Sequence, residues 1–196
     1  MILPKMVAVI GGKHSGKTTV IERLIAELKR RGFRVGTVKE MMRIPTLDTP
    51  ATETDRYSNA GAEIIVAVPR EETVIFIKKR LDVKEISPYM EKLDYVLLEG
   101  FEREQSIPKI IAAKTSNEVK SYMDHSAIAI SGLILESNPE MEKAAAFGVP
   151  MFRISTQAET LPIWSLKKPL PATTIKPQFA TKTKITFICF VALGLS

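Results

Sequence analysis

The feature that most constrains the fold of this chain is a glycine-rich segment close to its N-terminus. Residues 11–18 read GGKHSGKT and match the pattern G-x-x-x-x-G-K-[ST]. In this pattern the glycines allow a tight turn whose backbone N–H groups surround phosphate oxygens. Lys17 would supply a positive charge to the terminal phosphates, and the hydroxyl of Thr18 would bind Mg²⁺. The segment therefore predicts a binding site for a phosphorylated ligand.

The residues on either side of this segment have the periodicity that such a loop requires. Residues 6–10 (MVAVI) form a short apolar run that is typical of a strand buried in a parallel sheet. Residues 17–31 place their apolar side chains on one helical face, and Gly32 is a natural helix stop. Residues 33–39 then predict a second strand, so the segment is a βαβ unit.

The rest of the chain continues in the same α/β manner. A strand at 62–68 and its antiparallel partner at 73–77 predict a β-hairpin. Further expected elements are strands at 95–98, 107–113, 127–130 and 151–154, and helices at 87–93 and 139–147.

Composition indicates one globular nucleotide-binding domain followed by a tail. The chain has 196 residues, of which 45% are hydrophobic and 26% are charged, and such a chain needs no disulfide to hold a core. We expect the domain to cover residues 1–164. Residues 165–196 predict a Pro/Lys-rich linker and a short apolar end that is poorly ordered. The apolar run 185–195 is shorter than the roughly 20 residues of a membrane span.

Charge and cysteine content exclude several functional classes. The net charge of +6 is concentrated in the lysines of residues 165–184, and no basic stripe is interleaved with aromatic residues, so nucleic-acid binding is not predicted. Cys189 is the single cysteine, which excludes an internal disulfide and a cysteine-cluster metal site. No secretory signal is evident, and a lone thiol fits a reducing compartment, so we expect a cytoplasmic protein.

One acidic residue stands where a nucleotide site would need it. Glu99 stands at the carboxyl end of the predicted strand 95–98, directly after Leu98. Nucleotide sites form beyond the carboxyl ends of parallel strands. A carboxylate there can hold Mg²⁺ or orient an attacking water. Asp94 begins the same strand and should lie about 15 Å away, at the other end of the sheet.

The polar stretch 40–56 is open to two interpretations. It is either a solvated loop or a switch segment that senses the terminal phosphate through Mg²⁺. Among its acids, Asp48, Glu53 and Asp55, we prefer Asp55, because it just precedes the entry into a predicted strand.

Three other residues carry weaker expectations. His14 lies within the glycine-rich loop and either touches phosphate or faces solvent. Lys109 is either a surface lysine or a residue close to the nucleotide. His125 has no evident partner and is taken as structural.

These motifs, in this order, resemble the family of molybdopterin-guanine dinucleotide biosynthesis protein B (MobB). The resemblance covers roughly residues 5–155. Its more specific part is the succession of Asp55-Arg56, Asn59-Ala60-Gly61-Ala62, Leu97-Leu98-Glu99-Gly100-Phe101 and Pro108-Lys109-Ile110. The resemblance implies a P-loop nucleoside triphosphatase fold, with a mostly parallel sheet flanked by helices and an added β-hairpin.

The resemblance also implies a function. It implies a GTP-binding accessory protein with weak Mg²⁺-dependent GTPase activity that forms a homodimer. The implied partners are molybdopterin and the MobA-like enzyme that joins a guanine nucleotide to molybdopterin. The implied catalytic residues are Lys17 and Glu99, and the implied Mg²⁺ ligands are Thr18, Asp55 and Glu99. The implied nucleotide-binding residues are Gly11, Gly12, Lys13, His14, Ser15, Gly16, Lys17, Thr18 and Thr19.

The chain departs from the family at two places. Glu40 stands where a histidine usually follows the lysine that ends the second strand, and Glu53-Thr54 stands where Gly-Lys usually precedes the aspartate. No N-K-x-D guanine signature is present. Residues 113–116 (AKTS) are its only distant echo, so guanine preference rests on the resemblance.

Two alternatives remain open. A small-molecule kinase would bring mobile arginines to the transferred phosphoryl group, and Arg43, Arg56 and Arg70 are candidates. A metallochaperone GTPase would carry a histidine- or cysteine-rich metal site, which this composition does not offer.

Overall fold

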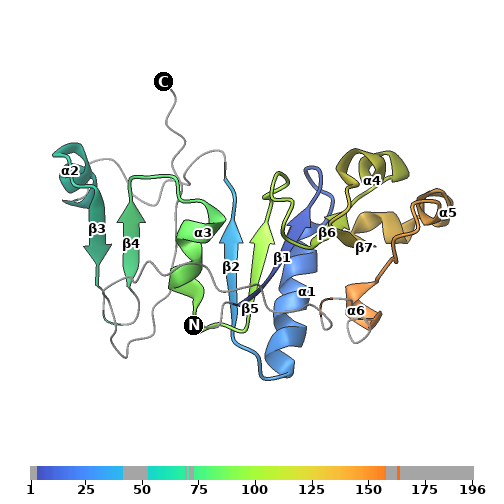
Figure 1. Ribbon diagram of the computed structural model, residues 1–196, viewed down its shortest axis with the longest axis horizontal. Coiled ribbons are helices and arrows are strands. Elements are labelled where there is room, and N and C mark those ends of the chain that lie inside the picture. The colour runs from blue at the N-terminus through green and yellow to red at the C-terminus, as the bar shows by residue number, and fades with distance from the viewer. Residues whose placement is uncertain (1–3, 42–52, 69, 71–72, 158–162, 164–196) are drawn as a thin grey trace. The chain divides into compact units, whose positions relative to one another are not determined.

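A computed structural model describes residues 4–41, 53–68, 70, 73–157 and 163 of the chain (Figure 1). The described residues divide into two compact units. The larger unit is formed by the residues up to Lys39 and from Met90 onward, and the smaller unit lies within Glu40–Tyr89. The expected tail, 165–196, lies outside the described residues.

The larger unit is built on a five-stranded parallel sheet with the order β2-β5-β1-β6-β7. Its strands are β1 (Lys5–Ile10), β2 (Val35–Lys39), β5 (Tyr95–Glu99), β6 (Lys109–Ala112) and β7 (Ala127–Ser131). All four pairings between neighbours are parallel. The mostly parallel α/β fold expected from the sequence is confirmed.

The central strand β1 shows why the apolar run at 6–10 forms a strand. Successive side chains alternate between the two faces, and Val7, Ala8, Val9 and Ile10 are all at most 1% exposed. A strand buried on both faces needs an uninterrupted apolar sequence, which is what the chain has here.

Helix α1 (Lys17–Arg30) follows the loop after β1 and packs on one face of the sheet (Figure 1). Its apolar stripe, which includes Leu24 and Leu28, shares a core with Val7 and Val9 of β1. The helix ends where its sequence predicts, because Arg31 and Gly32 donate backbone N–H bonds to the last-turn carbonyls and Gly32 has a φ of +83°.

The remaining helices of the larger unit follow β6 and β7. They are α4 (Ser116–Tyr122), the 3₁₀ helix η2 (Leu133–Glu136), α5 (Asn138–Ala145) and α6 (Ile154–Gln157). The expected helix at 139–147 is confirmed as α5. The strand expected at 151–154 is wrong: only Met151 pairs, in an isolated bridge with Ile130, and the chain then turns into α6.

The smaller unit contains the expected β-hairpin. Strands β3 (Ile64–Ala67) and β4 (Val74–Ile77) are antiparallel, with Val66 opposite Ile75. Before them lies α2 (Glu53–Asn59), so the expectation of a loop over 40–56 fails for its last residues; residues 42–52 are outside the described chain.

The helix expected at 87–93 begins earlier than the sequence suggested. It is α3 (Val83–Ile86) followed by the 3₁₀ helix η1 (Ser87–Met90). Asp82 is the N-cap: its carboxylate accepts from the Glu85 N–H, while the Glu85 carboxylate accepts from the Asp82 N–H. This reciprocal pair fixes the start of the helix ahead of Pro88.

Within the described part of the chain, every helix falls short of the length and apolar character needed to cross a bilayer.

Candidate functional site

The glycine-rich loop forms a tight turn between β1 and α1. Gly11 has a φ of +140°, and a Cβ atom built on it would lie 1.9 Å from the carbonyl oxygen of Ala112 in β6. Gly16, the N-cap of α1, has a φ of +94°. His14 also has a positive φ, of +57°. These conformations turn the backbone back on itself, as a phosphate-binding loop requires, and they explain why glycine is needed at two of the positions.

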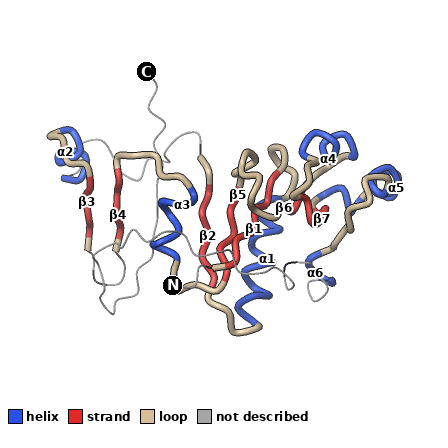
Figure 2. The backbone as a smooth tube through the Cα atoms, in the orientation of Figure 1, coloured by secondary structure: helices blue, strands red, loops and turns tan. Residues whose placement is uncertain are grey.

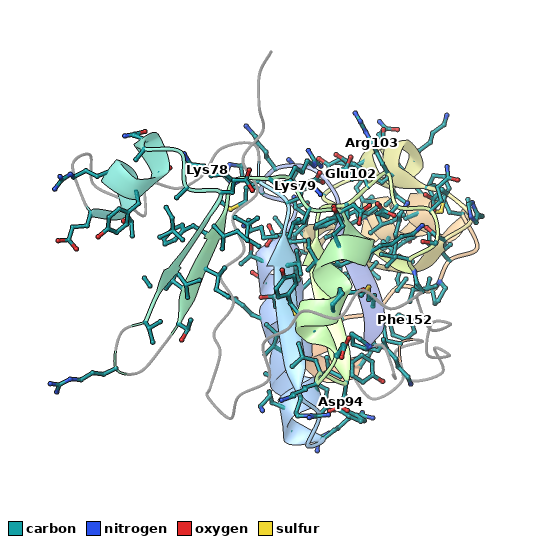
Figure 3. All side chains as sticks on the ribbon, turned by 60° about the vertical axis from the view of Figure 1, so that its left-hand side comes forward. Lys78, Lys79, Asp94, Glu102, Arg103 and Phe152 are labelled. Carbon is teal, nitrogen blue, oxygen red and sulfur yellow. The ribbon has the colours of Figure 1, made fainter. Side chains whose placement is uncertain are left out.

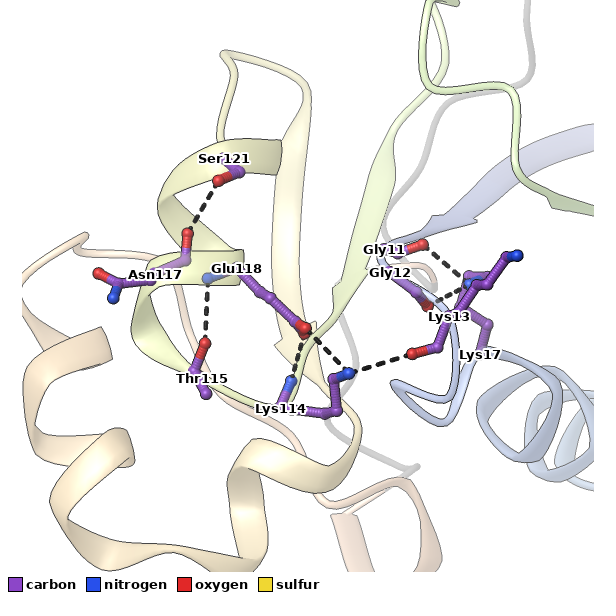
Figure 4. A network of polar contacts seen from close by, with 9 residues as sticks. All are labelled: Gly11, Gly12, Lys13, Lys17, Lys114, Thr115, Asn117, Glu118 and Ser121. Atoms are coloured by element: carbon purple, nitrogen blue, oxygen red, sulfur yellow. Dashed lines mark hydrogen bonds and ion pairs between the residues drawn. The ribbon is translucent and has the colours of Figure 1, made fainter.

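Lys17 lies across this turn. Its Nζ donates hydrogen bonds to the carbonyl oxygens of Gly11 at 2.8 Å and Gly12 at 2.6 Å (Figure 4). Thr18 and Thr19 in the first turn of α1 are exposed, as are Lys13 and His14. The ammonium group is therefore held at the mouth of the loop, next to the N-terminus of a 14-residue helix.

Ser15 is the buried polar side chain of the loop. It is 1% exposed, and its Oγ has no hydrogen-bond partner among the described residues. Its carbonyl oxygen accepts the N–H of Leu133 at 3.3 Å. The loop backbone is thereby joined to the segment that follows β7.

The loop after β6 supports the glycine-rich loop from another side. Lys114 Nζ donates to the carbonyl oxygen of Lys13 at 3.2 Å and forms an ion pair with Glu118 Oε1 at 3.2 Å (Figure 4). Glu118 also accepts the Lys114 N–H at 2.8 Å. The glycine-rich loop is thus braced by the segments that follow two neighbouring strands.

Glu99 lies at the carboxyl end of β5, beside the glycine-rich loop. Its Cα pairs with that of Val9 in β1, and the next N–H, of Gly100, donates to the Val9 carbonyl at 3.1 Å. The Glu99 carboxylate forms an ion pair with Lys39 Nζ at 3.0 Å. Lys39 ends the neighbouring strand β2, so two adjacent strands place opposite charges at this edge of the sheet.

Asp94 lies at the opposite end of β5, as expected from the strand length. Figure 3 shows it far from Glu102, which follows the other end of the strand. Its carboxylate accepts the backbone N–H of Arg34 at 2.8 Å and pairs with the Arg34 guanidinium at 3.4 Å. Asp94 therefore connects strand starts and is separated from the glycine-rich loop.

The site residues expected from the sequence are only partly brought together. Residues 11–19 and Glu99 converge at one edge of the larger unit. Asp55 falls in α2 of the smaller unit, and Asp48 is outside the described residues. Among the described residues, no group of three or more His, Cys, Asp or Glu side chains is placed to hold a metal ion. Of the three expected Mg²⁺ ligands, the larger unit therefore holds Thr18 and Glu99. Mg²⁺ commonly takes few protein ligands and completes its coordination shell with substrate phosphates.

Lys109 differs from the surface lysine considered above. It is 0% exposed at the start of β6, and its Nζ donates to Asp124 Oδ2 at 2.6 Å and to the carbonyl oxygen of Glu102 at 2.8 Å. Asp124 in turn accepts from the N–H of Ser126 at 2.9 Å and from its hydroxyl at 2.6 Å. His125, beside this cluster, is exposed.

Sequence reasoning missed most of these supporting residues. A signal for α4 was available, because Thr115 and Glu118 have the T-x-x-E spacing of a helix start, and Thr115 Oγ1 accepts the Glu118 N–H at 3.2 Å. No local signal pairs Lys109 with Asp124 or Lys39 with Glu99, since each pair comes from separate segments.

The larger unit thus presents a glycine-rich turn and a helix N-terminus at the carboxyl edge of a parallel sheet, and comparison with known proteins assigns the chain to a family. Residues 6–133 match the family described as molybdopterin guanine dinucleotide synthesis protein B. The chain belongs to the MobB family. The family resemblance seen in the sequence is therefore confirmed.

Named relatives and a solved structure agree with this family. A Methanocaldococcus jannaschii protein, named for an adapter role in molybdopterin-guanine dinucleotide biosynthesis, is 34% identical over 131 residues, which are 64% of this chain and 54% of that protein. A similarly named Bacillus subtilis protein is 28% identical over 152 residues, which are 75% of this chain and 84% of that protein. The crystal structure of Bacillus subtilis MobB aligns with a TM-score of 0.63 at 24% identity, covering 80% of this chain and 98% of that one. At this identity the structural match shows a shared fold.

The pKa of Asp124 leads to a pH-dependent prediction. Partial burial acts to raise this pKa, but hydrogen bonds from Lys109 and Ser126 outweigh burial and lower it from 3.8 to about 2. Because the folded pKa lies below the unfolded one, ionised Asp124 stabilises the fold fully above pH 3.8, and this contribution disappears as the pH falls through about 2.

We therefore expect Asp124→Asn to melt below the wild type near neutral pH and the difference to shrink in acid. The measurement is the thermal midpoint of both proteins by circular dichroism between about pH 7 and pH 2. Glu142→Gln, which neutralises an exposed carboxylate on α5, is the control. A constant difference across this range would contradict the assignment of Asp124 to a charged pair.

Proposed function

We propose that this chain binds GTP with Mg²⁺, hydrolyses it slowly at most, and acts as an adapter in the formation of molybdopterin guanine dinucleotide. The observation that carries the proposal is the turn between β1 and α1, with left-handed conformations at Gly11, His14 and Gly16 and the Lys17 ammonium at its mouth. Membership in the MobB family supports the choice of pathway and of guanine nucleotide.

The physical basis of phosphate binding is the concentration of positive potential at this turn. The N-terminus of α1 has unpaired N–H groups in its first turn, and its N-cap, Gly16, has no side chain to satisfy them. An anion at this position accepts these N–H groups and interacts favourably with the helix dipole. Lys17 adds a full charge, and its Nζ has only to leave two carbonyl oxygens to reach a phosphate.

Mg²⁺ would be held chiefly by the nucleotide and by two oxygen donors of this unit. The Thr18 hydroxyl is exposed at the start of α1, and Glu99 is on the adjacent strand edge. Glu99 is now paired with Lys39, so a cation would compete with an ammonium group for the carboxylate. Asp55, on α2, is the third proposed ligand.

The charged groups at the carboxyl edge of the sheet support slow hydrolysis. Phosphoryl transfer is accelerated mainly by positioning and by positive charges at the transferred group. Glu99 is the proposed residue that orients water, yet its charge is offset by Lys39. The nucleotide would then serve mainly to set a conformation that a partner recognises.

A homodimer is part of the proposal, and the hairpin of the smaller unit supports it. Ile64, Val66 and Val68 are 59%, 51% and 74% exposed, and Tyr57 of α2 is 56% exposed. Ile64 and Val66 lie on the same face of β3, because alternate residues of a strand share a face. Exposed apolar clusters of this kind mark contact surfaces. The other proposed partners are molybdopterin and the MobA-like enzyme that attaches the nucleotide to it.

The first test is Lys17→Ala. We expect GTP affinity to fall by about tenfold or more, because a charge-assisted contact to the terminal phosphates is lost. The measurement is calorimetric titration with GTP, and with ATP for comparison, in the presence of Mg²⁺. Lys29→Ala, on the exposed face of the same helix, should bind as the wild type does. Equal GTP affinity in Lys17→Ala would refute the site.

The second test is Glu99→Gln, which keeps the shape of the side chain and removes its charge. We expect GTP to bind still, while hydrolysis slows by about tenfold or more, since the residue that orients water is lost. The measurement is phosphate release under single-turnover conditions. Glu102→Gln, an exposed acid three residues further on, is the matched control. A wild-type rate in Glu99→Gln would remove Glu99 from catalysis.

The third test is Val66→Lys on the exposed face of the hairpin. We expect the homodimer to dissociate at concentrations where the wild type is dimeric, because a charge would have to be buried in an apolar contact. The measurement is sedimentation velocity over a range of concentrations. Ala26→Lys introduces the same charge on an exposed position of α1 and should leave the dimer intact. Dissociation in both variants, or in neither, would argue against this surface.

A further inference from the structure

The buried lysine at the start of β6 has no part in the proposed chemistry, yet among the described residues it is the one charged residue that is buried. The side chain of Lys109 is 1% exposed, whereas that of its partner Asp124 is 32% exposed. The other residues of β6, Ile110, Ile111 and Ala112, are apolar and fully buried. An ammonium group in such surroundings is retained only when it is paired and hydrogen-bonded.

The partners of Lys109 connect two loops. Asp124, whose Oδ2 accepts from Lys109 at 2.6 Å, belongs to the segment before β7, and its Oδ1 accepts from the N–H and hydroxyl of Ser126. The Glu102 carbonyl oxygen, at 2.8 Å, belongs to the loop 100–108 that joins β5 to β6. The ammonium group therefore ties the loop 100–108 to a fixed point in the body of the unit.

The loop 100–108 begins directly after Glu99 and beside the phosphate-binding loop. Gly100 and Phe101 both have positive φ, of +91° and +59°, so the chain makes a sharp turn between Glu99 and Glu102. A non-glycine residue in this conformation costs about 1–3 kcal/mol and persists only where neighbouring contacts hold it. The Lys109–Glu102 bond is one such contact, and the Glu104 N–H donates to the Phe101 carbonyl at 3.1 Å as another.

We propose that Lys109 is a positioning residue, whose buried ammonium group, anchored on Asp124, holds the loop 100–108 by the Glu102 carbonyl and thereby fixes Glu99 for the Mg²⁺–nucleotide complex. This inference rests on the proposed GTP- and Mg²⁺-binding function. It adds that the nucleotide site is controlled by a charge pair that touches neither the nucleotide nor the metal.

If Lys109 served only the stability of the fold, removing the whole ion pair would leave nucleotide and Mg²⁺ binding unchanged. Replacing a buried ion pair by apolar residues of similar size is often neutral or stabilising, because both desolvation costs vanish. Lys109→Met combined with Asp124→Leu removes both charges, so neither charge is left without its partner; the Ser126 N–H and hydroxyl lose the acceptor that Asp124 provides. The fold should then survive while the directional bond to Glu102 is lost.

The experiment compares this double variant with the wild type and with Leu28→Ala, a fully buried substitution near the C-terminal end of α1, which is the end away from the glycine-rich loop. Thermal midpoints establish the stability of each protein. GTP affinity is measured in EDTA, and the Mg²⁺ concentration for half-maximal hydrolysis and kcat are measured well below the melting temperatures. Hydrogen exchange of the peptide covering 100–107 reports the loop directly.

We expect the double variant to bind GTP in EDTA as the wild type does, but to need about tenfold more Mg²⁺ or to lose about tenfold in kcat, because Glu99 is no longer held. Exchange in the loop should accelerate in the double variant only. Leu28→Ala should melt earlier and keep wild-type values for both Mg²⁺ and kcat.

Unchanged Mg²⁺ dependence, kcat and loop exchange in a folded double variant would overturn the inference. If the double variant does not fold, Asp124→Asn takes its place at neutral pH, and the same readouts decide. If the wild type itself fails to bind GTP, the proposed function is refuted, and the exchange measurement alone shows whether Lys109 holds the loop.

Discussion

The parallel pairing of β1 between β5 and β6 is the constraint on which the rest of the larger unit depends. Because all three strands point the same way, the segments that follow them emerge at one edge of the sheet (Figure 2). The glycine-rich loop, Glu99 and the Lys114–Glu118 pair come from these three segments. Their proximity therefore results from strand direction, and the close approach of Gly11 to the Ala112 carbonyl shows how tightly the neighbouring backbones pack there.

Charges near this edge are arranged in pairs that belong to different segments. Lys39 with Glu99 and Lys109 with Asp124 each join residues far apart in the chain. The first pair is partly solvated, because the Lys39 side chain is about half exposed. The second contains a fully buried ammonium, so breaking it would leave a charge without compensation. Loss of the second pair would therefore destabilise the fold more than loss of the first.

Several elements could be predicted because their signals are local. The run at 6–10, the stripe of α1 and the glycines of the loop require no knowledge of distant contacts. The prediction of a strand at 151–154 failed because only Met151 forms a bridge, with Ile130 of β7, and Ile154 already begins α6. Helix α2 was missed because its sequence, ETDRYSN, has no apolar stripe to distinguish it from a polar loop.

By itself, the sequence determined the glycine-rich turn, the βαβ unit that carries it and the family, because each depends on residue types at fixed short spacings. Only the tertiary structure decided that Lys109 is buried, that Asp124 balances it and that Glu99 meets Lys39. The physical reason is that electrostatic pairing depends on distance in space. Two residues become partners only when the sheet order brings their strands together, and no local pattern encodes that order.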